Sequence, residues 1–164
     1  MSYTPDRLTR LVRDALKGLS AEGAKPTVSI AKDPWNVIEI LTDAPRGVRL
    51  VIHWAGEEAL GDEPAAPLAT QRIEVIVGFA LGLRAGVDSA LVENLENRPS
   101  LLRLVSLVRA RVLGMTFTEP DASEGLFRYR GCEPVETPEG VPLAAYRLRF
   151  ELDTNMPDIE PVEV

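Results

Sequence analysis

Apolar residues near the start of the chain, over Thr4–Leu19, recur at intervals of three and four. This spacing puts them on one face of a helix, and charged residues fill the opposite face. Thr4 suits the N-cap and Pro5 the first helical turn. We therefore predict an amphipathic helix whose buried stripe comprises Leu8, Leu11, Val12, Ala15, Leu16 and Leu19.

A second helical pattern follows Arg98-Pro99-Ser100. Arg103, Ser106 and Arg109 occupy its polar face, and Gly114 stands where a helix would end. The predicted buried stripe comprises Leu101, Leu104, Val105, Val108 and Val112.

Between these helices the apolar pattern changes to a period of two, which is typical of strands. Strands are predicted over Thr27–Ala31, Asn36–Thr42, Val48–Trp54 and Arg72–Phe79. The segment Asp43–Gly47 is rich in turn-forming residues and predicts a tight hairpin loop. Together these elements predict an antiparallel four-strand meander.

Two closing strands are predicted after the second helix, over Leu126–Cys132 and Ala144–Leu152. Both alternate apolar and charged residues, and a turn-rich connection over Glu133–Pro142 separates them. The predicted fold is α+β: an N-terminal helix, the meander, a second helix and two closing antiparallel strands. We expect one domain over residues 1–152 and a flexible acidic arm over residues 153–164.

Three internal segments have no clear period. Ala55–Thr70 is acidic and rich in Ala, Pro and Gly, which predicts a mobile hairpin tip or a solvated insertion. Leu81–Asn97 has an ambiguous pattern, which we interpret as a long loop with one helical turn near Ser89–Glu96. Phe117–Gly125 is predicted as a loop.

Composition narrows the range of functions. The chain has 164 residues, 45% of them apolar, and a net charge of −7. A length of this order predicts one core that needs no metal or disulfide. The acidic balance disfavours a general nucleic-acid clamp, because phosphate affinity depends on Lys and Arg. No segment reads as a signal peptide or a membrane span, so we expect a protein of a reducing cytosol.

Candidate catalytic residues are few. His53 and Cys132 are the only histidine and cysteine, so an ordinary Cys/His zinc site is excluded. Neither residue sits in a recognisable nucleophile motif, and we interpret His53 as a surface or rim residue and Cys132 as a structural thiol. No phosphate-binding glycine loop, GxSxG or HExxH sequence is present. We therefore expect no catalytic residue, cofactor or metal.

Charged clusters are the stronger candidates. Glu57, Glu58, Asp62 and Glu63 form an acidic group that either binds a divalent cation or, as we favour, is solvated. If the two closing strands pair, Arg128, Arg130, Arg147 and Arg149 share one solvent-facing side of the sheet. Such a stripe fits contact with acidic partner surfaces or nucleic acid, or protection against edge-to-edge aggregation.

Two stretches carry a family resemblance. One is Arg98-Pro99-Ser100-Leu101-Leu102-Arg103-Leu104-Val105-Ser106-Leu107-Val108-Arg109, followed by Leu113-Gly114. The other combines Gly131-Cys132-Glu133-Pro134 with Ala145-Tyr146-Arg147-Leu148-Arg149-Phe150-Glu151-Leu152. With the element order, they make the chain similar to the tail terminator and tail-completion proteins of long-tailed bacteriophages and prophages.

The resemblance implies a non-enzymatic subunit that assembles into a ring, typically a hexamer, on the end of the tail tube. Its partners would be copies of itself, the tail-tube protein and a head-completion protein, in the bacterial cytoplasm during assembly and then in the virion tail. Neither a membrane nor sequence-specific nucleic acid is implied. Arg103, Arg109 and the four strand arginines would then be interface residues, and the acidic group at Glu57–Glu63 a mobile docking or lumen loop.

The sequence is also compatible with other functions. A head-tail joining or minor tail protein shares the same small α+β type. A cytoplasmic ligand-binding or regulatory module would use residues 83–97 as a lid. A hydrolase acting through His53 with the acidic loop is a third alternative.

Overall fold

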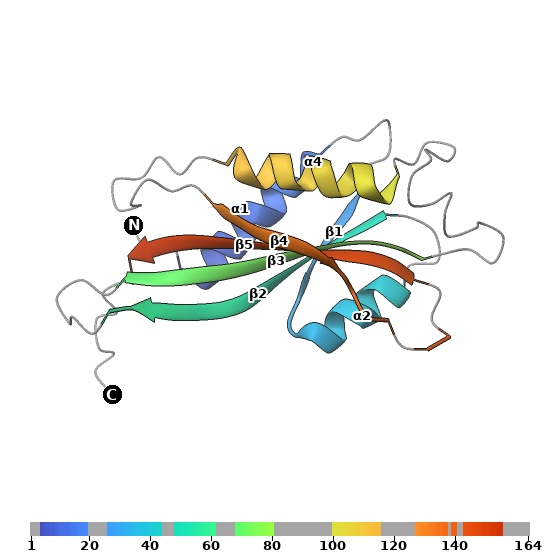
Figure 1. Cartoon of the computed structure of the whole chain (residues 1–164), viewed down its shortest axis with the longest axis horizontal. Coiled ribbons are helices and arrows are strands. Elements are labelled where there is room, and N and C mark those ends of the chain that lie inside the picture. The colour runs from blue at the N-terminus through green and yellow to red at the C-terminus, as the bar shows by residue number, and fades with distance from the viewer. Residues whose placement is uncertain are drawn as a thin grey trace.

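A mixed five-stranded sheet with helices on both faces forms the centre of the molecule (Figure 1). The computed structural model describes residues 4–19, 26–43, 48–61, 68–80, 100–115, 127–137, 139–140 and 143–155. The described elements, in chain order, are α1 (Pro5–Lys17), β1 (Thr27–Ala31), α2 (Pro34–Thr42), β2 (Val48–Leu60), β3 (Leu68–Ala80), α4 (Leu101–Leu113), β4 (Arg128–Pro134) and β5 (Leu143–Asn155). The α+β prediction is confirmed.

Helices α1 and α4 form where the apolar stripes predicted them. Leu8, Val12 and Leu16 of α1 are fully buried. All five predicted stripe residues of α4 are buried as well. Ser100 caps α4, because its Oγ accepts a hydrogen bond from the Arg103 N–H at 3.2 Å, and Gly114 ends that helix. Thr4 occupies the N-cap of α1 but its side chain makes no capping bond.

The predicted strand at Asn36–Thr42 is wrong, since these residues belong to helix α2. Asp33 caps the helix by accepting the Asn36 N–H at 2.8 Å, and Pro34 occupies the first turn. Val37 and Leu41, four residues apart, are the buried positions. The β-branched residues of this segment favour a strand locally. The Asp33 cap and the burial of Val37 and Leu41 against the sheet nevertheless make the segment a helix.

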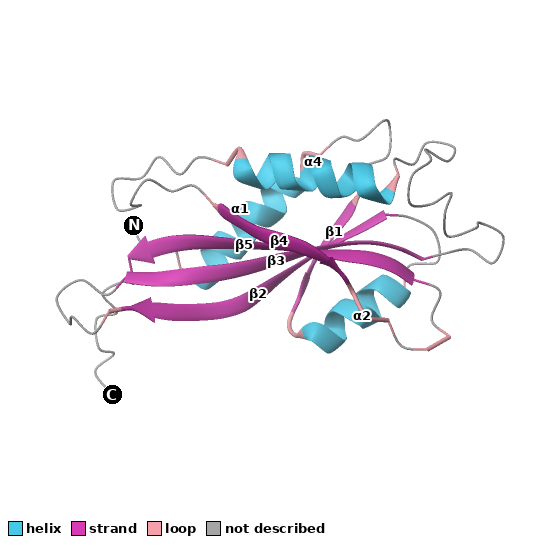
Figure 2. Ribbon diagram, in the orientation of Figure 1, coloured by secondary structure: helices cyan, strands magenta, loops and turns pink. Residues whose placement is uncertain are grey.

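The antiparallel meander is therefore also wrong in its first half. The strand order is β1-β2-β3-β5-β4, and β1 pairs with β2 in parallel. Helix α2 makes the connection between these parallel strands, as Figure 2 shows. A parallel pair needs such a crossover, whereas a hairpin loop joins only antiparallel neighbours. The expected hairpin at Asp43–Gly47 thus leads from α2 to β2, and residues 44–47 lie outside the described residues.

Strands β2 and β3 form a longer antiparallel ladder than the sequence predicted. Their pairing runs from Val48 with Phe79 to Leu60 with Leu68, interrupted by a bulge between Trp54 and Gly56. Much of the expected loop at Ala55–Thr70 is therefore strand, and only residues 62–67 lie outside the description. The segments 81–99 and 116–126, with their ambiguous and loop predictions, also lie outside it.

The two closing strands pair as expected. Strand β5 lies between β3 and β4, antiparallel to both, and β4 bulges between Tyr129 and Gly131. Gly131 has a φ of 125°, a backbone conformation that glycine adopts more easily than other residues. Strand β5 continues to Asn155, beyond the expected start of the acidic arm; residues 156–164 are not described.

The core has two layers, one on each face of the sheet. The larger lies between the sheet and helices α1 and α4, with Leu50, Ile73 and Phe150 fully buried in it. The smaller lies under α2, where Leu41 meets Val51 and Ile76. A Cβ on Gly78 would stand 2.7 Å from Leu41 Cδ2, so α2 packs this closely only because β3 has a glycine there.

Candidate functional site

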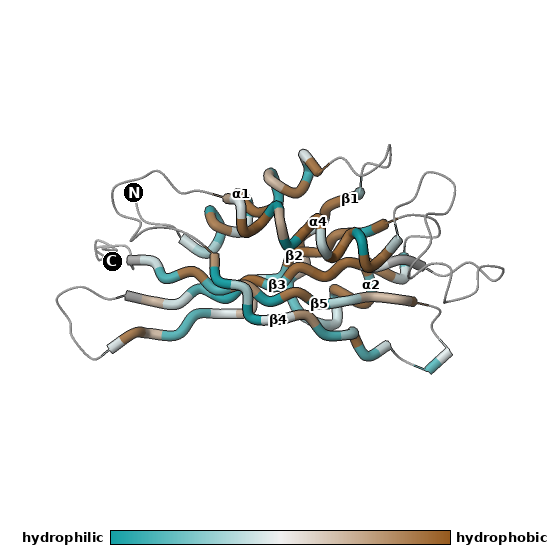
Figure 3. Tube along the Cα trace, turned by 45° about the horizontal axis from the view of Figure 1, so that its top comes forward, coloured by the Kyte–Doolittle hydropathy of each residue, from teal (hydrophilic) through white to brown (hydrophobic). Residues whose placement is uncertain are grey.

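Helix α2 covers only one end of its face of the sheet, and charged side chains occupy the rest of that face. We call this surface the charged face. Figure 3 shows its outermost strand, β4, as mostly hydrophilic. The residues of the charged face, from β2 to β5, are Glu58, Arg72, Glu74, Arg128, Arg130, Glu133, Arg147, Arg149, Glu151 and Asp153.

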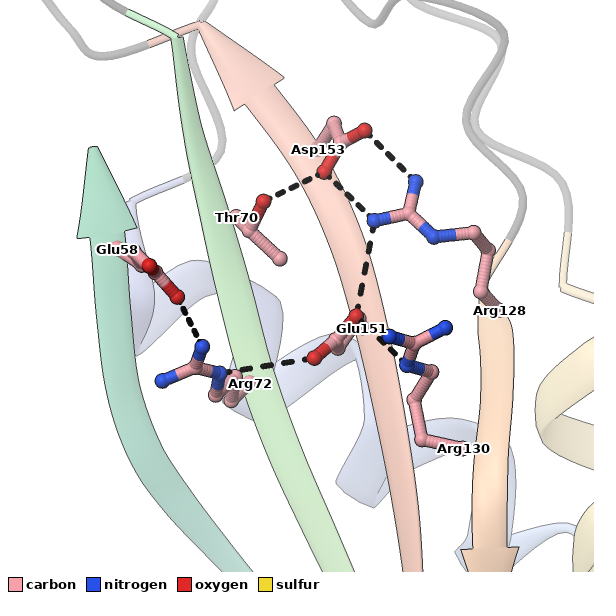
Figure 4. A network of polar contacts seen from close by, with 7 residues as sticks. All are labelled: Glu58, Thr70, Arg72, Arg128, Arg130, Glu151 and Asp153. Atoms are coloured by element: carbon pink, nitrogen blue, oxygen red, sulfur yellow. Dashed lines mark hydrogen bonds and ion pairs between the residues drawn. The ribbon is translucent and has the colours of Figure 1, made fainter. Parts of the chain in front are cut away.

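One network on this face centres on Glu151 and Asp153 of β5 (Figure 4). Arg128 holds Asp153 through two hydrogen bonds, Nη1 to Oδ2 at 2.7 Å and Nη2 to Oδ1 at 2.9 Å. Arg130 Nε lies 3.0 Å from Glu151 Oε2, and Arg72 Nε lies 3.6 Å from Glu151 Oε1. Arg72 also pairs with Glu58 on β2. The network therefore links four strands of the sheet.

The two hydrogen bonds between Arg128 and Asp153 shift the pKa of both side chains. The hydrogen bond from Arg128 holds the pKa of Asp153 below its ordinary value of 3.8, and a hydrogen bond from the Thr70 hydroxyl adds to the effect. The same contact raises the pKa of Arg128. Both groups are thus charged at neutral pH, and the paired state is the stable one.

A second network centres on Glu74 of β3. Arg147 Nε lies 3.2 Å and Arg149 Nε lies 3.7 Å from the Glu74 carboxylate. Both arginines also contact Glu133 on β4. His53 Nδ1 lies 3.4 Å from Glu74 Oε2, which places this histidine at the margin of the network rather than beside a nucleophile.

Among the described residues of the charged face, five arginines stand against five carboxylates. The stripe of four strand arginines exists as predicted, but each arginine is paired with an acidic side chain of the same sheet. These acidic partners were not predicted from the sequence. Arg72 and Glu74 are two residues apart on β3, so the sequence indicates that both lie on the same face of the sheet. The strand order, which places β3 beside β5, is what brings them next to Glu151 and Arg149.

The two helix arginines lie elsewhere. Helix α4 covers the opposite face of the sheet, where the Arg109 guanidinium carbon lies 5.7 Å from the centre of the Tyr129 ring. Arg103 is exposed on the same helix. The six candidate interface arginines therefore form two separate surfaces, four on the charged face and two on α4.

The two described residues of the predicted acidic group, Glu57 and Glu58, also lie on different surfaces. Glu57 and Glu58 are consecutive residues of β2 and turn to opposite faces of the sheet. Glu57 Oε2 accepts a hydrogen bond from Gln71 Nε2 at 2.6 Å, whereas Glu58 pairs with Arg72. Asp62 and Glu63 lie outside the described residues.

Cys132 lies on the face opposite His53. It is exposed, it pairs in register with Leu148, and partial removal of water around its thiol raises the pKa of that thiol. The two residues therefore do not form a nucleophile and base pair. Within the described ranges no cluster of three metal-ligating side chains occurs. None of the described helices is long and apolar enough to span a membrane.

Comparison with known proteins supports the fold. No protein-family model matches the sequence, and no curated protein matches it. Among solved structures, 32 chains match. One belongs to the "Virion of native gene transfer agent (GTA) particle", with a TM-score of 0.53 and 12% identity over 88% of this chain and 92% of that one. At this identity the likeness shows that the two chains share a fold.

Proposed function

We propose that this protein is a non-enzymatic structural component of a phage-like particle. The observation that carries the proposal is the match over nearly the whole length of both chains to a component of a gene transfer agent virion. The tail-terminator resemblance of the sequence points to the same class of particle. The arrangement of His53 and Cys132 on opposite faces agrees with a role that needs no bond-making chemistry.

Within that class, we propose that the protein forms a ring that ends the tail tube and offers a surface to the head. Such a role requires contacts between copies and a face that meets the tube. The four arginines of the charged face, with Arg103 and Arg109 on α4, are candidates for these contacts. An arginine bound to one carboxylate keeps further N–H donors for a second. Asp62 and Glu63 remain candidates for a docking or lumen loop.

Tube polymerisation tests the proposal directly. The tail-tube protein encoded by the same genome is polymerised with and without this chain, and tube lengths are measured by electron microscopy. We expect shorter tubes that carry a ring of added density at one end. An acidic protein of similar mass serves as the control and should leave the lengths unchanged.

Unchanged tube lengths without density at either end would remove the tail-terminator role. Mass spectrometry of purified particles separates this result from the broader proposal. A chain present in particles that does not end tubes would be another virion component, such as a head-tail joining or minor tail protein. Its absence from particles would overturn the virion role as well.

A further inference from the structure

The chain has two tryptophans, and both are on the surface. Trp35, in the first turn of α2, is 75% exposed. The backbone beneath it is fixed by the Asp33 cap and by the Lys32 N–H, which donates to Asn36 Oδ1 at 3.1 Å. An exposed tryptophan on a fixed backbone turn is the kind of side chain that dominates the binding energy of protein interfaces.

A hollow of about 510 Å³ lies on the other side of the sheet, between α1 and the end of β1. Its apolar walls include Ile30 and Trp54, which are 41% and 36% exposed. The Trp54 indole N–H donates to Gln71 Oε1 at 2.9 Å, and Gln71 is held in turn by Glu57. The indole wall is therefore already in place, which lowers the entropy cost of filling the hollow.

The margins of these two surfaces carry opposite charge. The hollow is lined by Lys32 and by the ion pair of Arg10 with Asp6, an excess of one positive charge. The groove beside Trp35 is lined by Glu133, Glu136 and Arg147, an excess of one negative charge. Complementary margins of this kind favour one orientation of approach between two copies.

We propose that Trp35 of one copy occupies the hollow between Ile30 and Trp54 of a second copy. Trp35 follows closely on Ile30 and Lys32 along the chain, but α1 and α2 lie on opposite faces of the sheet, so the tryptophan and the hollow are on different surfaces (Figure 1). A contact between different surfaces repeats from copy to copy and closes into a ring when the rotation allows. This inference rests on the proposed function and names the residues at the centre of the subunit contact.

Light scattering and sedimentation of the full chain, over a series of concentrations, measure its self-association and so test this contact. Wild type is expected to form species larger than a dimer. Trp35→Ala should weaken association by about 30-fold or more, the equivalent of about 2 kcal/mol for a central interface residue. Leu60→Ala removes another exposed apolar side chain, on β2 and away from the candidate contact residues of α4, and should keep the wild-type mass. Circular dichroism verifies that both variants are folded.

A mixing experiment tests the pairing itself. Ile30→Glu blocks the hollow but keeps Trp35, whereas Trp35→Ala keeps the hollow. At a concentration where wild type associates and each weakened variant alone is monomeric, an equimolar mixture should give dimers and nothing larger. A mixture that stays monomeric would overturn the pairing of these two surfaces, as would a wild-type protein that is monomeric at every concentration.

The outcomes also separate this contact from the proposed function. If wild type ends tubes while Trp35→Ala and Ile30→Glu keep the wild-type mass, the contact is wrong and the function stands. If Trp35→Ala abolishes association but wild type leaves tubes unaltered and is absent from particles, the contact stands and the function is wrong.

Discussion

Asp153 shows how single residues determine the character of the charged face. Its carboxylate receives two hydrogen bonds from Arg128 and one from Thr70, from the strands on both sides of β5. A residue expected in a loose acidic arm is thus part of the sheet. The alternation of the sequence continues through Leu152 and Asp153 to the buried Thr154, but the acidic composition obscured it.

Removing the Arg128 contact should destabilise the fold in a pH-dependent way. Because the folded-state pKa of Asp153 lies below 3.8, the stabilisation is present above that pH and is lost as the pH falls through the folded-state pKa. We expect Arg128→Gln to lower the free energy of unfolding at pH 7 by about 0.5–1 kcal/mol, since the arginine is 48% exposed and solvent screens the pair.

Urea unfolding at pH 7 and at pH 2–3 measures this difference. Arg10→Gln, which breaks the exposed Arg10–Asp6 pair on α1, is the control and should change stability less. A loss for Arg128→Gln that is as large in acid as at pH 7 would show that packing of the guanidinium, rather than the charge contact, stabilises the strands.

At the scale of elements, helices α1 and α4 could be predicted from the sequence, whereas α2 could not. Helices α1 and α4 have wide apolar stripes over several turns, and their periodicity identifies them. In α2 the run Val37, Ile38, Ile40 and Leu41 fits both a strand and a short helix. Asp33-Pro34 was the deciding signal, but its weight depends on the sheet that buries Val37 and Leu41.

The Asp33 cap should therefore matter more than the residue at the start of α1. Asp33→Ala removes the acceptor of the Asn36 N–H and is expected to cost about 1 kcal/mol of unfolding free energy. Thr4→Ala is the matched control, because Thr4 makes no side-chain capping bond and its loss should cost a few tenths of a kcal/mol.

Thermal and chemical denaturation compare the two cap variants directly. Equal losses for the two would contradict the role of the Asp33 cap. The comparison also bears on the Trp35 contact, because the cap fixes the turn that presents this tryptophan.

At the scale of the whole molecule, the net charge of −7 is unevenly distributed. The charged face is balanced in its described residues, so the acidic excess lies elsewhere. The sequence identified the arginines of this face from the period of two. It could not identify their partners, because Glu74 and Arg149 come together only through the pairing of β3 with β5.

The charged face carries as many described carboxylates as arginines, so we expect it not to bind DNA. Neutralising two of these carboxylates should allow DNA binding. Wild type is expected to leave labelled duplex DNA unbound in fluorescence anisotropy. Replacing Glu133 and Glu151 by Gln frees arginines from both networks and should produce binding that weakens steeply with salt. The double replacement of Glu136 and Glu139, two exposed acids on the connection between β4 and β5, is the matched control.

Equal DNA binding by both double variants would attribute the effect to net charge rather than to the arginines of the face. Binding by wild type would contradict the balance itself.

The β3–β5 ladder has a consequence for the order of events during synthesis. It joins Leu68 with Asn155 and Ala80 with Leu143, so the centre of the sheet closes only after a long stretch of chain has been made. Such distant pairing is slow, because the loop must close before its contacts form. Until β5 emerges from the ribosome, Ile73 and Val75 lack the strand that completes their layer of the core. We therefore expect translation that stops before β5 to leave a chain whose core is incomplete, and such a chain would lack the surfaces that the proposed contacts between copies require.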